Sequence, residues 1–210
     1  MIKEVVVENF TKVPDVMERG ANRIELCDNL AVGGTTVSHA VAVQTIDYCK
    51  SKNVPVMAMV RPRGGNFIYG VDEIEMMKQD LIHLKELGTD GVVFGCLTVS
   101  GWIDEEAMRA LLGLAEGIEV AFHMAFDQIK PEYQFKAIDW LIEHGVDRIL
   151  THGGASGTRI EDNLDRLKEY VDYAAGRITI LPGGGITDSN YLHVTSVLEV
   201  NEVHGTKLVG

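Results

Sequence analysis

The segment Asp72–Phe94, DEIEMMKQDLIHLKELGTDGVVF, shows the unit from which the chain is built. Its first part, Asp72–Leu87, carries apolar residues three or four positions apart, which is the period of an amphipathic helix. Gly88 predicts the helix end, because glycine readily adopts the left-handed conformation that terminates helices. Gly91–Phe94 then forms a short apolar run typical of a buried strand. The apolar positions on one face of the helix are Ile74, Met77, Leu81 and Leu84.

Two further details of the helices can be predicted. Asp72 and Glu75 stand three residues apart just before the apolar face, which predicts a capping box at the helix start. A second helix is predicted over Ser38–Lys50, and it contains Cys49. We expect Cys49 to be a core residue, since a free cysteine usually packs like a small apolar side chain.

The order of helix stop and strand recurs along the chain. Gly20–Ile24 and Gly145–Ile149 repeat the pattern of Gly88–Val92, in which a glycine leads within a few residues into an apolar run. Eight such runs follow one another, with helical segments between them. They are Ile2–Val7, Arg23–Leu26, Pro55–Val60, Gly91–Phe94, Glu119–Phe122, Arg148–Leu150, Ile178–Leu181 and Glu199–Val203.

Strict alternation of strand and helix predicts parallel strands joined by right-handed crossovers. Eight strands, without an early G-x-G-x-x-G sequence, favour an α/β fold of the closed (β/α)8 TIM barrel type over an open dinucleotide-binding sheet. No Pro/Ser-rich linker interrupts the series, so we expect a single domain over residues 1–210. Only Gly205–Gly210 follow the eighth run and His204, so we expect the closing C-terminal helix to be missing or truncated.

The amino-acid composition limits the classes of partner that the protein can bind. A net charge of −12 at pH 7 opposes binding to nucleic acid or to anionic membrane surfaces. No apolar run approaches the ~20 residues that a membrane span needs. The three cysteines lack disulfide-like spacing, which points to the reducing cytosol. We therefore expect a cytoplasmic protein whose partner is a small anionic ligand or a metal ion.

Polar residues at the carboxyl ends of the strands are site candidates, because the functional groups of TIM barrels lie on that face. Glu8, Glu25, His123 and Asp127 are the candidates for acid–base catalysis. His123 is the best single candidate, since imidazole titrates near neutral pH and this histidine directly follows a strand. The alternative for His123 is a structural hydrogen bond to Asp127 or another carboxylate.

Two arginines follow the third strand. Arg61 and Arg63 flank Pro62, which fixes the backbone between them. A pair of guanidinium groups at the barrel mouth is suited to clamping a carboxylate or phosphate. The alternative is a salt bridge to Glu8 or Glu25.

Glycine-rich turns follow the sixth and seventh strands. Such turns resemble a phosphate cradle, because glycines allow backbone N–H groups to approach an oxyanion. Each could instead be a tight turn without a ligand. His204, after the eighth strand, is a further candidate for contact with the anion. The turn residues are Gly153, Gly154, Gly183, Gly184 and Gly185.

Soft donor atoms near the mouth make a copper(I) site the alternative to an anion site. Cys27 and Cys96 each end a strand, and Cys27 is the stronger candidate ligand. Thiolate and thioether sulfurs are the ligands that Cu(I) prefers. No C-x-x-C or H-x-x-x-H spacing supports a preformed site. The thioethers nearest the mouth belong to Met57, Met59 and Met124.

Five segments of the chain together carry a resemblance to a known family. They are Gly20–Cys27, Val60–Tyr69, Asp90–Gly95, Phe122–Asp127 and Pro182–Ile186. R-P-R-G-G and F-H-x-A-F-D are the long and specific motifs among them. The segments resemble the CutC copper homeostasis protein family, and the likeness extends from the first strand to His204. The resemblance implies a cytosolic TIM barrel, often a homo-oligomer, that is named for copper tolerance and proposed to bind Cu(I), with no settled reaction.

The sequence departs from the family pattern at two positions. Met124 stands where the family usually has arginine, and His152 stands where it usually has serine. The lost arginine weakens an anion site, whereas the new methionine and histidine add metal donors. The first strand has no thiol to pair with Cys27, so a two-cysteine site would need Cys96 or another source.

Two functions from different classes follow. The first is a copper-linked binding protein in which Cys27 is the ligand and His123 or Met124 assists. The second is an enzyme that acts on a small anionic or phosphorylated substrate by acid–base chemistry. The second explains more of the polar residues, because arginines and carboxylates are hard groups that a Cu(I) carrier does not require. A scaffold that only self-associates is the third possibility.

Overall fold

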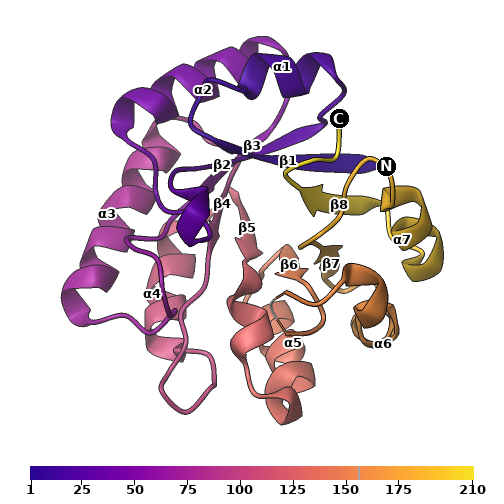
Figure 1. Cartoon of the computed structure of the whole chain (residues 1–210). Helices are drawn as coiled ribbons and strands as arrows, with labels where there is room; N and C mark the ends of the chain where they lie inside the picture. Colours follow the sequence, from indigo (N-terminus) through magenta and orange to yellow (C-terminus); the bar gives the residue numbers. More distant parts are fainter. Residues whose placement is uncertain (156) are drawn as a thin grey trace.

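Eight parallel strands form a nearly closed barrel in the computed structural model, which describes residues 1–155 and 157–210 (Figure 1). The strands pair in the order β7-β6-β5-β4-β3-β2-β1-β8, and β7 lies beside β8 at the seam. The predicted TIM barrel is therefore confirmed. The strands are β1 Ile2–Glu8, β2 Arg23–Cys27, β3 Val56–Met59, β4 Gly91–Phe94, β5 Glu119–Phe122, β6 Arg148–Thr151, β7 Thr179–Pro182 and β8 Glu202–Gly205.

Helices cover the outside of the barrel, and each lies between two consecutive strands in the chain (Figure 1). Ser38 caps the second helix, where its hydroxyl accepts a hydrogen bond from the backbone N–H of Val41. The α-helices are α1 Val13–Glu18, α2 His39–Ser51, α3 Val71–Glu86, α4 Glu105–Leu114, α5 Gln134–Glu143, α6 Leu164–Ala174 and α7 Tyr191–Leu198.

Two local predictions were wrong. Helix α3 is capped at Gly70, whose backbone N–H donates to Glu73 Oε2 at 2.8 Å, so the Asp72 and Glu75 pair does not form the capping box. The predicted eighth strand began too early at Glu199, because Glu199 adopts a left-handed conformation with φ of 57° and ends α7. Strand β8 therefore starts three residues later in the chain, at Glu202.

Alternation along the strands produces two separate apolar regions. Every second strand residue faces the helices and joins the large outer core, which also contains Cys49 and Cys96. The other residues face the barrel interior, where a small apolar cluster fills the middle. Its members are Val6, Cys27, Met57, Met59, Val93 and Ala121.

Charged side chains fill the interior near the strand starts. Arg23 binds Glu4 and Glu202, and Arg148 binds Glu202 and Glu119. Glu202 therefore joins the two arginines, with its Oε2 2.6 Å from Arg23 Nη2 and 2.8 Å from Arg148 Nε. This group, called here the strand-start network, links β1, β2, β5, β6 and β8. It closes the barrel at the end opposite to the mouth.

The segment after β8 packs back on the barrel without forming a helix. The side chain of Leu208 is fully buried in the outer core. Lys207 bridges to Thr187 in the loop after β7, where the backbone N–H of Asp188 donates to the Lys207 carbonyl at 2.8 Å. Within the described ranges, none of the helices has the length and apolar character required to cross a membrane.

Candidate active site

A cavity of about 400 Å³ opens at the carboxyl ends of the strands. Five of the residues predicted for the site line it, namely Glu25, His123, Gly184, Gly185 and His204. The other lining residues come from loops and from the interior of the barrel. They are Val6, Leu30, Gly33, Met59, Phe67, Met124, Leu150, Ile186, Thr187, Gly205, Thr206 and Lys207.

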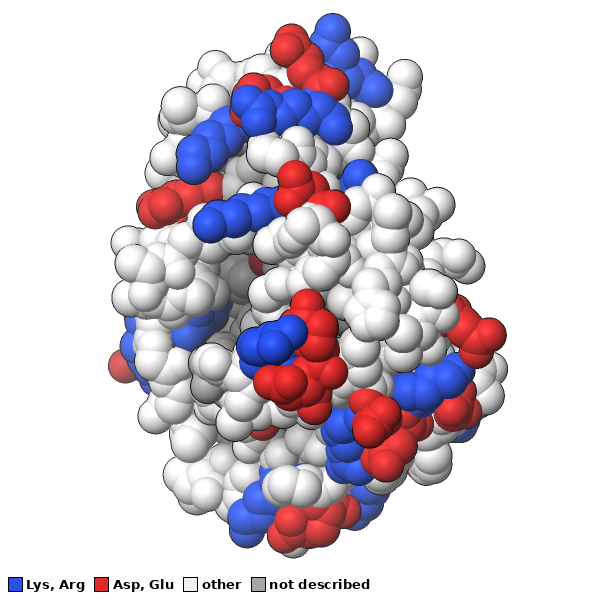
Figure 2. All heavy atoms as spheres, turned by 45° about the vertical axis from the view of Figure 1, so that its right-hand side comes forward, with Lys and Arg blue, Asp and Glu red and all other residues white. Residues whose placement is uncertain are grey.

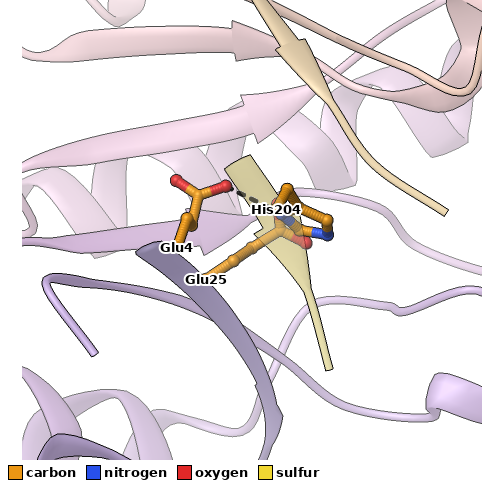
Figure 3. Close-up of side chains that lie close together, drawn as sticks. All are labelled: Glu4, Glu25 and His204. Atoms are coloured by element: carbon orange, nitrogen blue, oxygen red, sulfur yellow. Dashed lines mark hydrogen bonds and ion pairs between the residues drawn. The ribbon is translucent and has the colours of Figure 1, made fainter. Parts of the chain in front are cut away.

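The floor of this cavity carries a buried cluster of Glu4, Glu25 and His204 (Figure 3). His204 Nδ1 lies 2.8 Å from Glu4 Oε1 and 3.8 Å from Glu25 Oε2. Because Nδ1 is engaged by Glu4, the imidazole is held in one orientation by a carboxylate. Glu4 belongs to β1, Glu25 to β2 and His204 to β8, so three adjacent strands build the cluster.

The pKa values of the Glu4 and Glu25 carboxyl groups differ sharply. Burial raises the pKa of Glu25 to about 7, because the opposing charge of His204 does not compensate for the lost hydration. Burial acts on Glu4 in the same sense, but the hydrogen bond from His204 and the charge of Arg23 outweigh it and lower its pKa to about 2. Two neighbouring carboxyls with separated pKa values are typical of acid–base sites.

The pKa of His204 depends on these two carboxyl groups. Burial alone would lower its pKa, but the charge of Glu25 and the hydrogen bond to Glu4 raise it overall. The pKa of Glu25 is thus about 7, that of His204 is raised above its ordinary value, and both side chains face the cavity. This pair can give or take a proton from a small molecule bound above it.

His123 occupies the wall of the cavity as a neutral imidazole. Burial, followed by the nearby charge of Arg61, lowers its pKa to about 3. The backbone N–H of Ala125 donates to His123 Nδ1 at 3.3 Å, so the ring proton sits on Nε2. Within the described residues, this buried Nε2–H has no hydrogen-bond partner. The predicted alternative, a hydrogen bond between His123 and Asp127, does not form.

Arg61 is buried beside this wall and binds backbone carbonyls instead of a carboxylate. Its Nη1 donates to the carbonyls of Val32 at 3.0 Å and Gly34 at 2.8 Å, and its Nη2 donates to the Gly65 carbonyl at 3.0 Å. The guanidinium also lies over the Phe67 ring, 4.8 Å from its centre. The predicted salt bridge to Glu8 or Glu25 does not form.

Arg63 points away from the cavity. It pairs with Glu73 at the start of α3, and its Nη2 donates to the Ile68 carbonyl at 2.8 Å. It therefore holds the loop before α3 and does not join Arg61 in a clamp. Glu8, another predicted residue, is exposed at the end of β1 and lines neither this cavity nor the adjacent one.

Asp127 organises the turn after β6. It accepts hydrogen bonds from the hydroxyl of Thr151 and from the backbone N–H groups of His152 at 2.9 Å and Gly153 at 3.2 Å. These bonds use the Gly153 N–H that a phosphate cradle would require. Gly154 packs so closely on Asn163 that an added Cβ would lie 2.3 Å from Asn163 Oδ1. This turn is therefore built around Asp127.

The turn after β7 is more open. The Gly183 N–H donates to the Thr151 carbonyl at 3.0 Å and so continues the strand pairing. Within the described residues, the backbone N–H groups of Gly184 and Gly185 have no hydrogen-bond partner. Both glycines line the mouth cavity, as well as an adjacent cavity of about 490 Å³ that Asp127 also borders. Two N–H donors are thus available to an anion.

The two candidate thiols lie in different regions. Cys27 is fully enclosed in the inner cluster, and its thiol donates to the Val7 carbonyl at 3.6 Å. Cys96 is buried in the outer core, so the structure does not bring the two thiols together. Burial raises the pKa of both thiols, which favours the protonated form over the thiolate that binds metals.

Sequence reasoning missed Glu4 and Lys207. Glu4 was left out because it lies near the start of a strand, a position that usually serves structure. It alternates with Val6 and Glu8 on the inward-facing side, and this spacing was the available signal. Lys207 lies on the segment after β8, which has no counterpart in the repeating unit, and it forms part of the cavity rim.

Comparison with known proteins identifies the family. The model of the CutC family matches residues 1–209. A CutC protein from Enterococcus faecalis is 59% identical over the full length of both chains. The mouse copper homeostasis protein cutC homolog is 39% identical and is aligned over 97% of this chain and 72% of its own length. The crystal structure of CutC from Streptococcus agalactiae superposes with a TM-score of 0.96 at 41% identity, covering 99% of each chain. The chain therefore belongs to the CutC family.

Proposed function

We propose that this protein is an enzyme that performs acid–base chemistry on a small anionic molecule in the mouth cavity. The observation that carries the proposal is the Glu25 carboxyl, which faces the cavity, titrates near pH 7 and lies 3.8 Å from His204. A group with a pKa near the working pH is the most effective proton donor and acceptor. Glu4 orients His204, and Arg23 holds Glu4 in turn.

The test is a pH titration of Glu25 by carbon NMR on glutamate-labelled protein. We expect one carboxyl resonance to titrate near pH 7, to vanish in Glu25→Gln and to persist in Glu8→Gln, which removes an exposed carboxylate outside the cavity. Inorganic phosphate should raise the Glu25 pKa further, since an anion in the cavity opposes a second negative charge. A Glu25 that titrates in the ordinary carboxyl range, or that ignores phosphate, contradicts the proposal.

Copper(I) binding is the second candidate function. Names of two mammalian relatives link the family to copper homeostasis. The specific observation in its favour is that the Cys27 thiol shares the inner cluster with the thioethers of Met57 and Met59, a soft donor set that fits Cu(I). The cluster of Glu4, Glu25 and His204 offers harder donors and fits Cu(I) less well.

A competition titration separates this candidate from the first. Reduced protein is titrated with Cu(I) against a chelator, and Cys27→Ser is compared with Cys96→Ser, which removes an equally buried thiol in the outer core. Copper binding at Cys27 predicts at least tenfold weaker binding in Cys27→Ser alone. Equal affinity in the two variants and the parent rules out Cys27 as the ligand.

The partners that we propose are small molecules or ions. On the face in Figure 2, positive and negative side chains are interleaved, and no broad basic surface suited to a phosphate backbone appears there. Three free, buried cysteines fit a cytosolic protein. Self-association stays a prediction from the family resemblance.

A further inference from the structure

His123 lines the mouth cavity, and its Nε2 is a buried hydrogen-bond donor that has no partner among the described residues. Five buried side chains in the described residues contain a polar atom without a partner, and among them only His123 lines this cavity. An unpaired buried donor is costly, so it commonly marks the position of a ligand atom or water. Because the proton is on Nε2, the group that completes this site is an acceptor, such as a carbonyl or enolate oxygen.

The same side of the cavity favours negative charge. The buried Arg61 guanidinium lies over the Phe67 ring, which packs on His123, and it has no carboxylate partner within the described residues. Gly184 and Gly185, whose backbone N–H groups have no hydrogen-bond partner among the described residues, line the rim together with Lys207. The side chains of Glu25 and His204 form the floor of the cavity. A bound molecule therefore meets hydrogen-bond donors and positive charge at the wall and rim, and a proton acceptor below.

We propose that the cavity takes a small carbonyl compound with a carboxylate or similar anionic group, and that His123 Nε2–H binds its carbonyl oxygen. This inference rests on the proposed function, in which Glu25 is the base. Ionised Glu25 removes a proton from the carbon next to the carbonyl. The electron pair of the broken C–H bond moves to form the enolate, whose oxygen accepts the hydrogen bond from His123. Transfer of the proton from Glu25 back to carbon restores the carbonyl compound and the ionised form of Glu25.

A neutral imidazole is well suited to this role. Its N–H has an acidity closer to that of an enol than an imidazolium has, so it stabilises the enolate by hydrogen bonding and keeps its own proton. The Phe67 ring, 4.6 Å from the imidazole centre, and the Ala125 N–H fix the ring. His123 is therefore held in place before a ligand enters, as electrostatic stabilisation requires.

Binding of oxalate tests the inference. Oxalate is a planar dianion that resembles the enolate of a 2-oxo acid, and oxamide is its neutral counterpart of the same shape. We expect oxalate to bind the full-length, metal-free protein and to move the His123 Nε2–H resonance downfield in histidine-labelled protein. His123→Leu should weaken binding at least tenfold, and His123→Gln should weaken it less because its amide retains an N–H donor. Oxamide should bind at least tenfold more weakly than oxalate.

Several results would overturn the inference. These are no oxalate binding, equal affinity in the parent and His123→Leu, no preference over oxamide, or an unmoved His123 resonance in the parent protein. The last measurement needs no variant, so a misfolded His123→Leu leaves the inference testable. Failure of the proposed function shows separately, as a Glu25 that titrates in the ordinary carboxyl range while oxalate still binds through His123.

Discussion

At the scale of single residues, the burial of Glu25 makes its ionisation oppose folding. Its pKa rises from 4.5 to about 7 in the folded protein, so between these values the folded state binds more protons than the unfolded state. The unfolding free energy contributed by Glu25 therefore falls as the pH rises through this window. The loss is complete above the folded pKa and is on the order of 3 kcal/mol for a shift of this size.

Replacement of Glu25 by glutamine should remove this dependence. We expect the unfolding free energy of Glu25→Gln, relative to the parent, to increase by about 3 kcal/mol between pH 4 and pH 8. Urea denaturation at several pH values measures it, with Glu8→Gln as the control for loss of one carboxylate. A constant difference across that range would mean that Glu25 ionises as readily in the folded protein as in the unfolded chain.

Single residues of the site were predictable by position but not by partner. Position at a strand end was enough to find Glu25, His123, Gly184, Gly185 and His204, all of which line the cavity. The sequence does not reveal which carboxylate meets which cation, because these partners come from distant strands. Arg61 therefore binds carbonyls, and Arg63 binds Glu73, against the expectation of a clamp.

At the scale of elements, the strand-start network takes the place of direct pairing across the barrel seam. Strands β7 and β8 close the barrel without a registered ladder, whereas Glu202 on β8 is bound by Arg23 of β2 and Arg148 of β6. Removal of one partner from a buried ion group leaves uncompensated charge, which typically costs about 3–5 kcal/mol. The network therefore connects both sides of the seam.

Glu202→Gln tests this connection. We expect it to lower the unfolding free energy by about 3 kcal/mol at neutral pH, since two largely buried guanidinium groups lose their shared carboxylate. Asp15→Asn, which breaks the exposed pair with Arg19, is the matched control and should cost less than about 1 kcal/mol. Equal losses in the two variants would show that the network does not hold the seam.

Elements with strong periodicity were predictable, and their boundaries were less so. Gly91–Phe94 and Glu119–Phe122 coincide with β4 and β5, because an apolar run between turn residues fixes both ends. Start positions failed where a backbone conformation decided them. Glu199 adopts a left-handed conformation without being glycine, and Gly70 caps α3 although it has no side chain. The amino-acid composition predicts neither the left-handed conformation of Glu199 nor the cap at Gly70.

At the scale of the whole molecule, the number and order of the strands followed from the repeat, but the manner of closure did not. Eight alternating units predicted the barrel, and the structure confirms it. The segment after β8 does not follow the strand–helix repeat, so the repeat does not predict where this segment lies. It lies against the loop after β7, buries Leu208 and brings Lys207 to the rim of the cavity. The same short segment thus helps to close the barrel and to form the rim of the cavity.

Leu208 should therefore stabilise the barrel far more than its position near the chain end suggests. We expect Leu208→Ala to lower the unfolding free energy by about 2–5 kcal/mol, because a fully buried leucine is lost from the outer core. Leu192→Ala is the matched control, since that side chain is 63% exposed on α7 and should change stability by about 0.5 kcal/mol or less. Urea denaturation of both variants measures the difference. Comparable small losses would show that the segment after β8 merely covers a barrel that is already closed by its strands.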